Sequence, residues 1–94
     1  MRKYEVVCIF HPDLDEEAFK AAHAKVREWI ADSGGNVDKE EIWGRRRLAF
    51  SIRKKNEGQY VLLNVSMDPA SLPGLNQNMR FLESLLRHMI TVVD

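Results

Sequence analysis

The chain has 94 residues, enough for one hydrophobic core and too few for two. Its 14 Lys and Arg balance 14 Asp and Glu, and its single Cys excludes an internal disulfide. No apolar run approaches the ~20 residues that a membrane span needs, and the N-terminus lacks the apolar stretch of a signal peptide. These counts favour one domain in a reducing, cytosolic compartment.

The neutral total charge hides a basic segment in the middle of the chain. Residues 1–40 carry six basic and nine acidic side chains, and residues 61–94 carry two and three. Residues 41–60 carry six basic and two acidic side chains, a net charge of +4. A local excess of this kind is typical of phosphate contact, and the alternative is a charged strand edge that resists aggregation.

Residues 3–10 predict a strand, because they are largely apolar and rich in β-branched and aromatic side chains. Nearly every position from 6 to 10 is apolar, so we expect a central strand that is covered on at least one face. An amphipathic helix follows, with Asp13 or Asp15 as its N-cap and Gly34-Gly35 as its C-terminal stop. Its apolar positions recur with helical spacing at Phe19, Ala22, His23, Val26 and Ile30.

Residues 36–54 change to an alternating pattern that predicts a long strand. Gly44 lies inside this strand and predicts a bulge or a sharp increase in twist. Residues 55–58 are typical of a turn, because the Asn and Gly among them tolerate positive φ. Residues 59–67 alternate again, so we expect the two strands to form a hairpin.

A second helix and a last strand complete the chain. Asp68-Pro69 is a good helix opening, although Pro73-Gly74 indicates that the regular helix begins only near Ser71. The apolar stripe of this helix recurs at Leu72, Leu75, Met79 and Leu82. Residues 87–93 predict the last strand. The order β-α-β-β-α-β over residues 1–94 predicts a single α+β domain of the ferredoxin-like type, with two helices on one face of a four-stranded antiparallel sheet.

No group of residues in the sequence has the types and spacing of a catalytic or metal-binding site. The three histidines are scattered, no pair of them has metal-ligand spacing, and CxxC and HExxH motifs do not occur. A helix N-terminus explains the acidic run from Asp13 to Glu17, and Cys8 sits among apolar residues, where we expect a buried, inert thiol. We therefore expect no enzyme, no metal and no cofactor.

Two tryptophans and one histidine are assigned to packing. We expect Trp29 at the rim of the core and His23 on the face of the first helix, because both lie on or beside its apolar stripe. Trp43 directly precedes Gly44, where it either covers the sheet or belongs to a partner surface that stacks on a base. We favour the first explanation for Trp43.

Three segments, in order and at matching separations, resemble a known family. They are Met1-Arg2-Lys3-Tyr4-Glu5, Gly44-Arg45-Arg46-Arg47-Leu48-Ala49-Phe50-Ser51-Ile52 and Lys54-Lys55-Asn56-Glu57-Gly58-Gln59-Tyr60. Together they resemble the bacterial small-subunit ribosomal protein S six family over essentially the whole chain. Phe50 replaces the Tyr that the family usually carries, which keeps the ring and loses a hydroxyl group. Several relatives continue as a flexible tail beyond the position of Asp94, so contacts made by such a tail are not carried over.

The resemblance implies a structural constituent of the bacterial small ribosomal subunit, located in the cytoplasm. Such a protein binds small-subunit (16S) rRNA in the central domain, or platform, jointly with ribosomal protein S eighteen, and supports assembly and translation. The resemblance implies no membrane partner and no small-molecule substrate. The residues assigned to rRNA or to the partner protein, without separating the two, are Arg2, Tyr4, Arg45, Arg46, Arg47, Phe50, Arg53, Lys54, Lys55, Tyr60, Arg80 and Arg87.

The charge balance agrees with this implication. With few basic groups, the protein alone should bind RNA weakly and lose affinity steeply as salt increases. Contacts from Arg and Lys to phosphates would position it, and no pattern indicates readout of base edges. A partner with its own basic surface would supply the remaining charge, so the near-neutral total predicts cooperative assembly.

Three alternatives share the same order of elements. A stand-alone RNA-binding module of the RRM type requires aromatic residues on its central strands, and residues 47–52 do not fit that pattern. An acylphosphatase-like enzyme requires an arginine in the loop after the first strand, whereas residues 11–15 are acidic and lack one. A regulatory ligand-binding domain that dimerises through its sheet is not excluded by any feature of the sequence.

Overall fold

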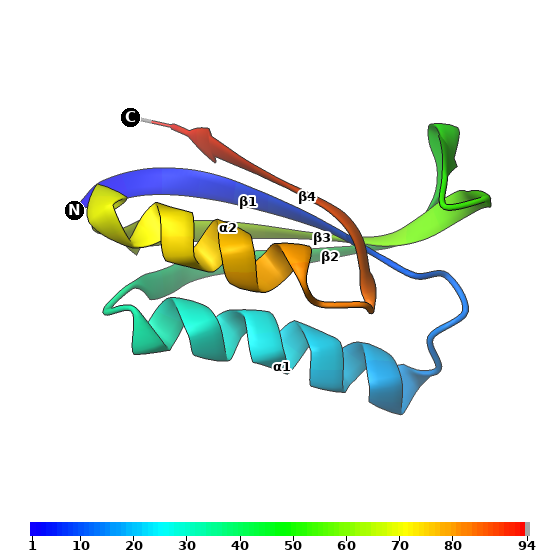
Figure 1. Cartoon of the computed structure of the whole chain (residues 1–94), viewed down its shortest axis with the longest axis horizontal. Helices are drawn as coiled ribbons and strands as arrows, with labels where there is room; N and C mark the ends of the chain where they lie inside the picture. The colour runs from blue at the N-terminus through cyan, green and yellow to red at the C-terminus, as the bar shows by residue number, and fades with distance from the viewer. Residues whose placement is uncertain (94) are drawn as a thin grey trace.

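The computed structural model describes residues 1–93 and has the predicted ferredoxin-like architecture, with both helices on one face of the sheet (Figure 1). Its elements are β1 (Arg2–Phe10), α1 (Glu16–Asp32), β2 (Asn36–Ile52), β3 (Lys55–Met67), a 3-10 turn (Pro69–Ser71), α2 (Leu72–Arg80) and β4 (Leu85–Val92). The strand order is β2-β3-β1-β4, and each neighbouring pair is antiparallel. The predicted α+β fold is confirmed.

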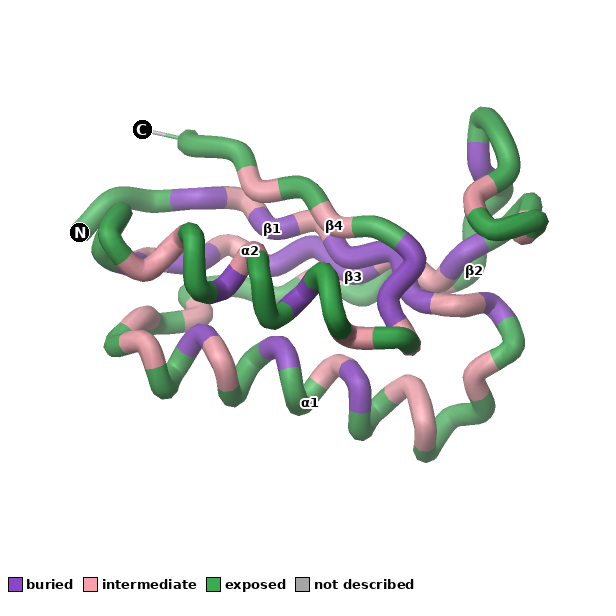
Figure 2. The backbone as a smooth tube through the Cα atoms, viewed as in Figure 1, coloured by how far each residue is buried: buried purple, intermediate pink, exposed green. Residues whose placement is uncertain are grey.

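β1 lies at the centre of the molecule, because β3 and β4 pair with its two edges. Its alternate side chains point toward the helices, and each of them is at most 5 % exposed. They are Tyr4, Val6, Cys8 and Phe10. The rest of the core consists of residues from the neighbouring strands and from both helices: Val61, Leu63, Val65 and Met67 of β3, Leu85 of β4, Ala22, Val26 and Ile30 of α1, and Leu75 and Met79 of α2. Figure 2 shows this buried layer between the sheet and the two helices.

The first helix begins and ends as its sequence predicts. Asp15 is the N-cap, and its carboxylate accepts a hydrogen bond from the amide of Ala18 at 2.8 Å. Gly34 adopts a φ of +81° directly after the helix, a conformation that favours glycine because it has no Cβ. Trp29 packs against the rim of the core, as expected.

The hairpin turn lies two residues earlier than predicted. Arg53 and Lys54 form a two-residue loop with φ values of +51° and +65°, so the assignment of residues 55–58 to the turn is wrong. Gly58 instead pairs with Arg46 inside the hairpin ladder. Gly58 is required there because a Cβ would collide with Cγ2 of Ile9 on the neighbouring strand.

The predicted irregularity at Gly44 is a β-bulge. The pairing register of β2 with β3 shifts between Ile42 and Gly44, and Gly44 has a φ of +80°. The bulge leaves Trp43 without a directly paired residue on β3. β2 continues beyond the bulge to Ile52, so the strand extends through Gly44.

The second half of the chain differs from the prediction in its bounds. α2 begins at Leu72, directly after the 3-10 turn, in agreement with the expected start near Ser71. α2 ends at Arg80, so Leu82 lies outside the helix while it still packs against the core. β4 begins at Leu85 rather than at residue 87, because Leu85 pairs with the end of β1.

Candidate nucleic-acid interface

The β2–β3 hairpin extends beyond the rest of the sheet and turns away from the helices (Figure 1). Its apolar residues Leu48 and Ile52 belong to a second apolar cluster with Ile9 and Leu86, separate from the main core. Leu48 is 9 % exposed, whereas the residues on either side of it are exposed. Leu48 and Ile52 thus hold the hairpin against the body of the domain, while most of the residues between and before them are exposed.

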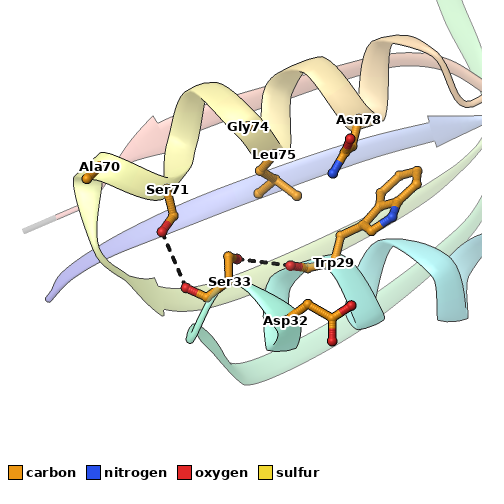
Figure 3. A pocket seen from close by; sticks show the side chains of 8 residues that line it. All are labelled: Trp29, Asp32, Ser33, Ala70, Ser71, Gly74, Leu75 and Asn78. Atoms are coloured by element: carbon orange, nitrogen blue, oxygen red, sulfur yellow. Dashed lines mark hydrogen bonds between the residues drawn. The ribbon is translucent and has the colours of Figure 1, made fainter.

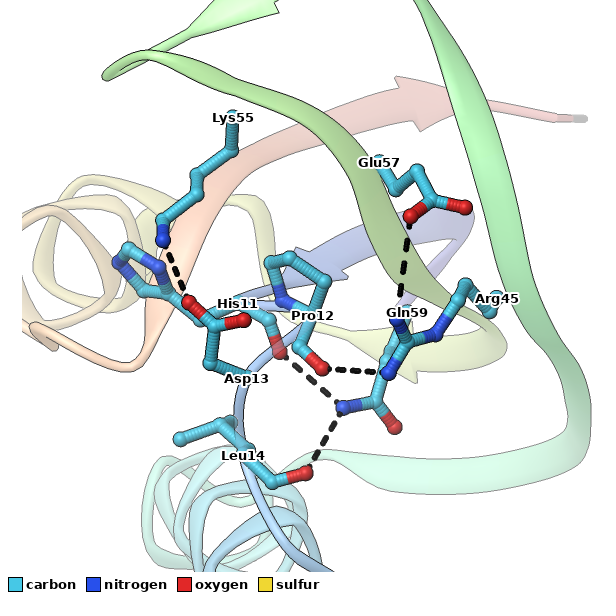
Figure 4. Close-up of polar contacts among 8 residues, drawn as sticks. All are labelled: His11, Pro12, Asp13, Leu14, Arg45, Lys55, Glu57 and Gln59. Atoms are coloured by element: carbon cyan, nitrogen blue, oxygen red, sulfur yellow. Dashed lines mark hydrogen bonds and ion pairs between the residues drawn. The ribbon is translucent and has the colours of Figure 1, made fainter.

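Two of the predicted basic residues hold the hairpin to the loop after β1 (Figure 4). The Arg45 guanidinium donates a hydrogen bond from Nη2 to the carbonyl oxygen of Pro12 at 2.7 Å, and its Nη1 lies 3.7 Å from Oε2 of Glu57. Lys55 forms an ion pair with Asp13, which holds the pKa of that carboxyl below its usual range. Arg45 and Lys55 are therefore partly neutralised within the chain.

Gln59 of β3, which pairs with Arg45 of β2, also contacts the loop after β1. Its side-chain amide donates hydrogen bonds to the carbonyl oxygens of His11 at 3.0 Å and Leu14 at 3.3 Å. Figure 4 shows the three side chains of the hairpin, Arg45, Lys55 and Gln59, directed at this loop. The loop is thus fixed by polar contacts that the sequence pattern did not predict.

An aromatic pair lies at the bulge. The rings of Trp43 and Tyr60 are stacked, with centroids 6.2 Å apart and an interplanar angle of 13°. The guanidinium carbon of Arg46 lies 5.5 Å from the centroid of the Trp43 ring, within the range of a cation–π contact. Trp43 is 42 % exposed. Arg46 and Tyr60, which the sequence analysis assigns to rRNA or the partner, therefore meet at a ring that still faces solvent.

The remaining basic residues of the hairpin are exposed. Arg47, Arg53 and Lys54 form no ion pair within residues 1–93. Phe50, at 65 % exposure, lies between them near the tip. The end of the hairpin therefore offers three positive charges and one aromatic ring to a partner.

The remaining residues that the sequence analysis assigns to rRNA or the partner lie in different parts of the fold. Arg2 lies at the end of β1 that is remote from the hairpin turn, about 26 Å from Phe10 at the other end at the usual rise of a strand. Tyr4 is 5 % exposed and packs in the core, so it is not brought together with the exposed residues of the hairpin, and its assignment to rRNA or the partner stays a prediction. Arg80 at the end of α2 and Arg87 near the start of β4 are brought together with Arg53 around one hollow.

A hollow of about 380 Å³ between the two helices does not have the composition of a catalytic site (Figure 3). Asp32 is the only ionisable residue that lines it. The Ser33 hydroxyl donates to the carbonyl oxygen of Trp29 at 2.9 Å, and the Ser71 hydroxyl donates to that of Ser33 at 3.3 Å. These polar groups join the end of α1 to the start of α2, and no nucleophile with an adjacent base is present among them.

The titratable groups inside the molecule have structural explanations. Burial raises the pKa of the Cys8 thiol to about 12, which keeps it protonated and unreactive. His23 packs on Phe19, and its Nε2 lies 2.5 Å from Oε1 of Glu40, to which Arg27 also donates at 2.8 Å. Burial, together with the positive charge of Arg27, lowers the pKa of His23 despite the opposing effect of Glu40. His23 thus lies on the helix face, where the sequence places it.

Residues 1–93 contain neither a candidate metal centre nor a membrane-spanning helix. Side chains of His, Cys, Asp and Glu form no group of three or more that could hold a metal ion. The helices of this part of the chain are too short or too polar to cross a membrane.

These features define a ferredoxin-like α+β domain whose positive charge is concentrated on a projecting hairpin. Comparison with known proteins identifies the family more closely. The family model described as Ribosomal protein S6 matches residues 3–92. The chain belongs to the ribosomal protein S6 family, whose members are proteins of the small subunit of the cytoplasmic ribosome. This is a family of structural ribosomal proteins and not an enzyme family.

Individual relatives agree over the full length. The chain is 38 % identical over 94 residues to small ribosomal subunit protein bS6 of Dictyoglomus turgidum, covering 100 % of this chain and 97 % of that protein. It is 43 % identical over 90 residues to bS6 of Clostridium botulinum, covering 96 % of each. The crystal structure of 30S ribosomal protein S6 from Thermotoga maritima has a TM-score of 0.93 and 29 % identity, covering 98 % of this chain and 87 % of that one.

Two residues of the candidate interface were not predicted as part of it. Trp43 was assigned to packing, although it contacts both Tyr60 and Arg46; its position beside the bulge was the available signal. His88 lines the hollow that also contains Arg80 and Arg87, and no local pattern in the sequence indicates this.

Proposed function

We propose that this protein binds small-subunit rRNA in the central domain of the subunit, cooperatively with ribosomal protein S eighteen, and supports assembly and translation. The observation that carries the proposal is the projecting hairpin, on which Arg47 and Lys54 are exposed and make no ion pair within residues 1–93. Cations on a protruding element can reach phosphates in the groove of a folded RNA.

The small number of such cations supports the cooperative part of the proposal. Arg45 and Lys55 are engaged with the loop after β1, and Arg46 lies over the ring of Trp43. The net charge of the whole chain is zero, so its long-range attraction to RNA is weak. A second protein that adds positive charge beside the hairpin would raise the affinity of both for RNA.

The sheet does not favour the RRM-type alternative. That mode of binding stacks bases on aromatic rings of the two central strands, which here are β1 and β3. Val7 and Ile9 occupy the face of β1 that points away from the helices, and Tyr60 of β3 is already stacked with Trp43. The exposed chemistry therefore supports contact with phosphates more than stacking of successive bases.

The test of this proposal is the affinity of the purified chain for a central-domain fragment of small-subunit RNA, with and without ribosomal protein S eighteen. We expect weak binding by the chain alone and tighter binding when the partner is present. Both affinities should be measured over a range of salt concentrations, since phosphate contacts make them salt-dependent. An affinity that does not change when the partner is added contradicts the cooperative mechanism.

A double substitution tests the role of the hairpin. Arg47→Ala with Lys54→Ala removes two exposed charges and should flatten the slope of log affinity against log salt by about 1.5, at about 0.7–0.9 per lost phosphate contact. Lys20→Ala with Lys25→Ala is the matched control, because it removes the same charge from α1, away from the hairpin. A slope that is the same in both variants would place the RNA elsewhere.

A further inference from the structure

A hollow of about 300 Å³ lies where three separate elements meet. Arg53 of the hairpin turn, Arg80 of the C-terminal end of α2, and Arg87 and His88 of β4 contribute its polar lining. The side chains of Met79, Leu85 and Leu86 complete the lining. These three are between 1 % and 6 % exposed, so the charged side chains lie over an apolar floor. We call this feature the arginine hollow.

The positive charge of the arginine hollow is not compensated within the chain. Arg53, Arg80 and Arg87 are exposed and make no ion pair within residues 1–93. No Asp or Glu is among the residues that line the hollow. His88 is held in place by a contact of 2.9 Å between its Nε2 and Oδ1 of Asn76 on α2.

The shift in the pKa of His88 also indicates an excess of positive charge at the hollow. Burial lowers the pKa of His88, and the positive charge of Arg80 lowers it further. No carboxylate contributes to this shift. Three arginines thus line one hollow without an ion-pair partner among residues 1–93, and a bound anion would offset their positive charge.

We propose that the arginine hollow binds a single phosphodiester of the RNA backbone. A guanidinium presents parallel N–H donors that match the oxygens of a phosphate, and three of them can share one anion. The apolar floor excludes water from one side and so strengthens these interactions. The inference rests on the proposed rRNA binding and deepens it, because it assigns Arg53, Arg80 and Arg87 to one phosphate rather than to three separate contacts or to the protein partner.

Such a phosphate would also connect the hairpin to the body of the domain. Arg53 belongs to the hairpin turn, whereas Arg80 ends α2 and Arg87 lies in β4, the edge strand on the other side of the sheet from β2. An anion held by all three fixes the position of the hairpin tip relative to β4. The hairpin cations Arg47 and Lys54 are not part of the lining, so the two groups can be tested independently.

The experiment is a double-mutant cycle on RNA binding in the presence of ribosomal protein S eighteen. Arg80→Gln, Arg87→Gln and the double variant keep side-chain length and polarity while they remove charge from exposed positions. Each single variant should weaken binding about tenfold or more, the size of a lost charge-assisted hydrogen bond. Lys20→Gln with Lys25→Gln is the charge-matched control and should change binding much less.

The cycle also decides how many phosphates are involved. If both arginines hold the same phosphate, their effects are coupled, and the double variant deviates by more than about twofold from the product of the two single losses. Effects that multiply within twofold mean separate contacts and overturn the inference. Binding that is unchanged in both single variants, or reduced equally in the control, overturns it as well.

A second measurement on the isolated chain is independent of rRNA binding. Inorganic phosphate is titrated while NMR follows the side-chain signals of His88 and of the arginines. Saturable shifts confined to the arginine hollow, lost in the Arg80→Gln and Arg87→Gln double variant, are expected. Shifts spread evenly over all cations overturn the anion site.

The two measurements together distinguish the sources of the anion. If phosphate saturates the hollow but the arginine variants bind RNA normally, the site serves a free phosphorylated compound and the assignment to RNA is wrong. If wild-type protein and partner do not bind the RNA fragment at all, the proposed function fails, and the assignment of the hollow to an RNA phosphodiester fails with it. The phosphate titration then decides only whether an anion site exists.

Discussion

Replacing Gly58 by Ala is expected to destabilise the fold by about 1–3 kcal/mol, the usual cost of inserting extra volume at a packed position. Gly58 is buried, and a Cβ there would collide with Cγ2 of Ile9 and lie 3.3 Å from the carbonyl oxygen of Phe10. Ile9 is itself 4 % exposed, and its β-branched side chain has few rotamers into which it can move. The carbonyl of Phe10 belongs to the central strand, so the backbone cannot shift freely either.

Thermal and urea unfolding, followed by circular dichroism, measure this loss. For a domain of this size, 1 kcal/mol corresponds to a change of about 4–8 °C in Tm, so the Gly58→Ala variant should melt well below the wild type. Gly74→Ala is the matched control, because nothing lies within 4 Å of its Cβ position on α2. The control should gain about 0.5–1 kcal/mol in helix propensity. A Gly58→Ala variant as stable as the wild type, beside a normal control, would refute the steric reasoning.

Three further predictions concern single groups. Asp15→Ala should lower the free energy of unfolding by about 1 kcal/mol, because it removes the N-cap bond to Ala18; an unchanged urea midpoint would contradict this. Burial lowers the pKa of His23 below its usual 6.5 despite Glu40, so the unfolded chain takes up the proton more readily and stability should fall as pH drops through 6.5 toward the folded pKa. The urea midpoint of the His23→Gln variant should not show this fall in stability between pH 8 and pH 5. If the midpoints of the variant and the wild type fall in parallel with pH, His23 is not the origin of the fall. The pKa of Cys8 is raised to about 12, so alkylation at pH 8 should follow the unfolded fraction as denaturant is added, and rapid labelling of the native protein would be inconsistent with its burial.

Local chemistry predicted most of the fold, because most boundary signals depend on a few neighbouring residues. Asp15 caps the first helix through its carboxylate, and Gly34 after the helix and Gly44 at the bulge adopt positive φ because they have no Cβ. The hairpin turn was misplaced because Arg53 and Lys54 adopt positive φ, which long side chains seldom do. Gly58 has the composition of a turn residue, but the close approach of β1 explains it instead, and that approach is a tertiary feature.

The sequence predicted which basic residues belong to the candidate site, but not which residues each of them contacts. The basic segment 41–60 was visible in the charge distribution, but nothing in it indicated that Arg45 would reach Pro12. Arg53 lines one hollow with Arg80 and Arg87, although it is remote from both in the sequence, and distances between remote segments are not encoded in local spacing. Tyr4 matched a family motif, yet alternation along β1 places it in the core.

The central position of β1 has a consequence for synthesis of the chain. β1 is translated first, but its partners β3 and β4 follow only at Lys55–Met67 and Leu85–Val92. The β2–β3 hairpin can form from adjacent sequence, whereas one edge of β1 stays unpaired until the last strand has left the ribosome. A nascent chain therefore carries an apolar strand with an open edge until Leu85–Val92 has been translated, and the four-stranded sheet closes only then.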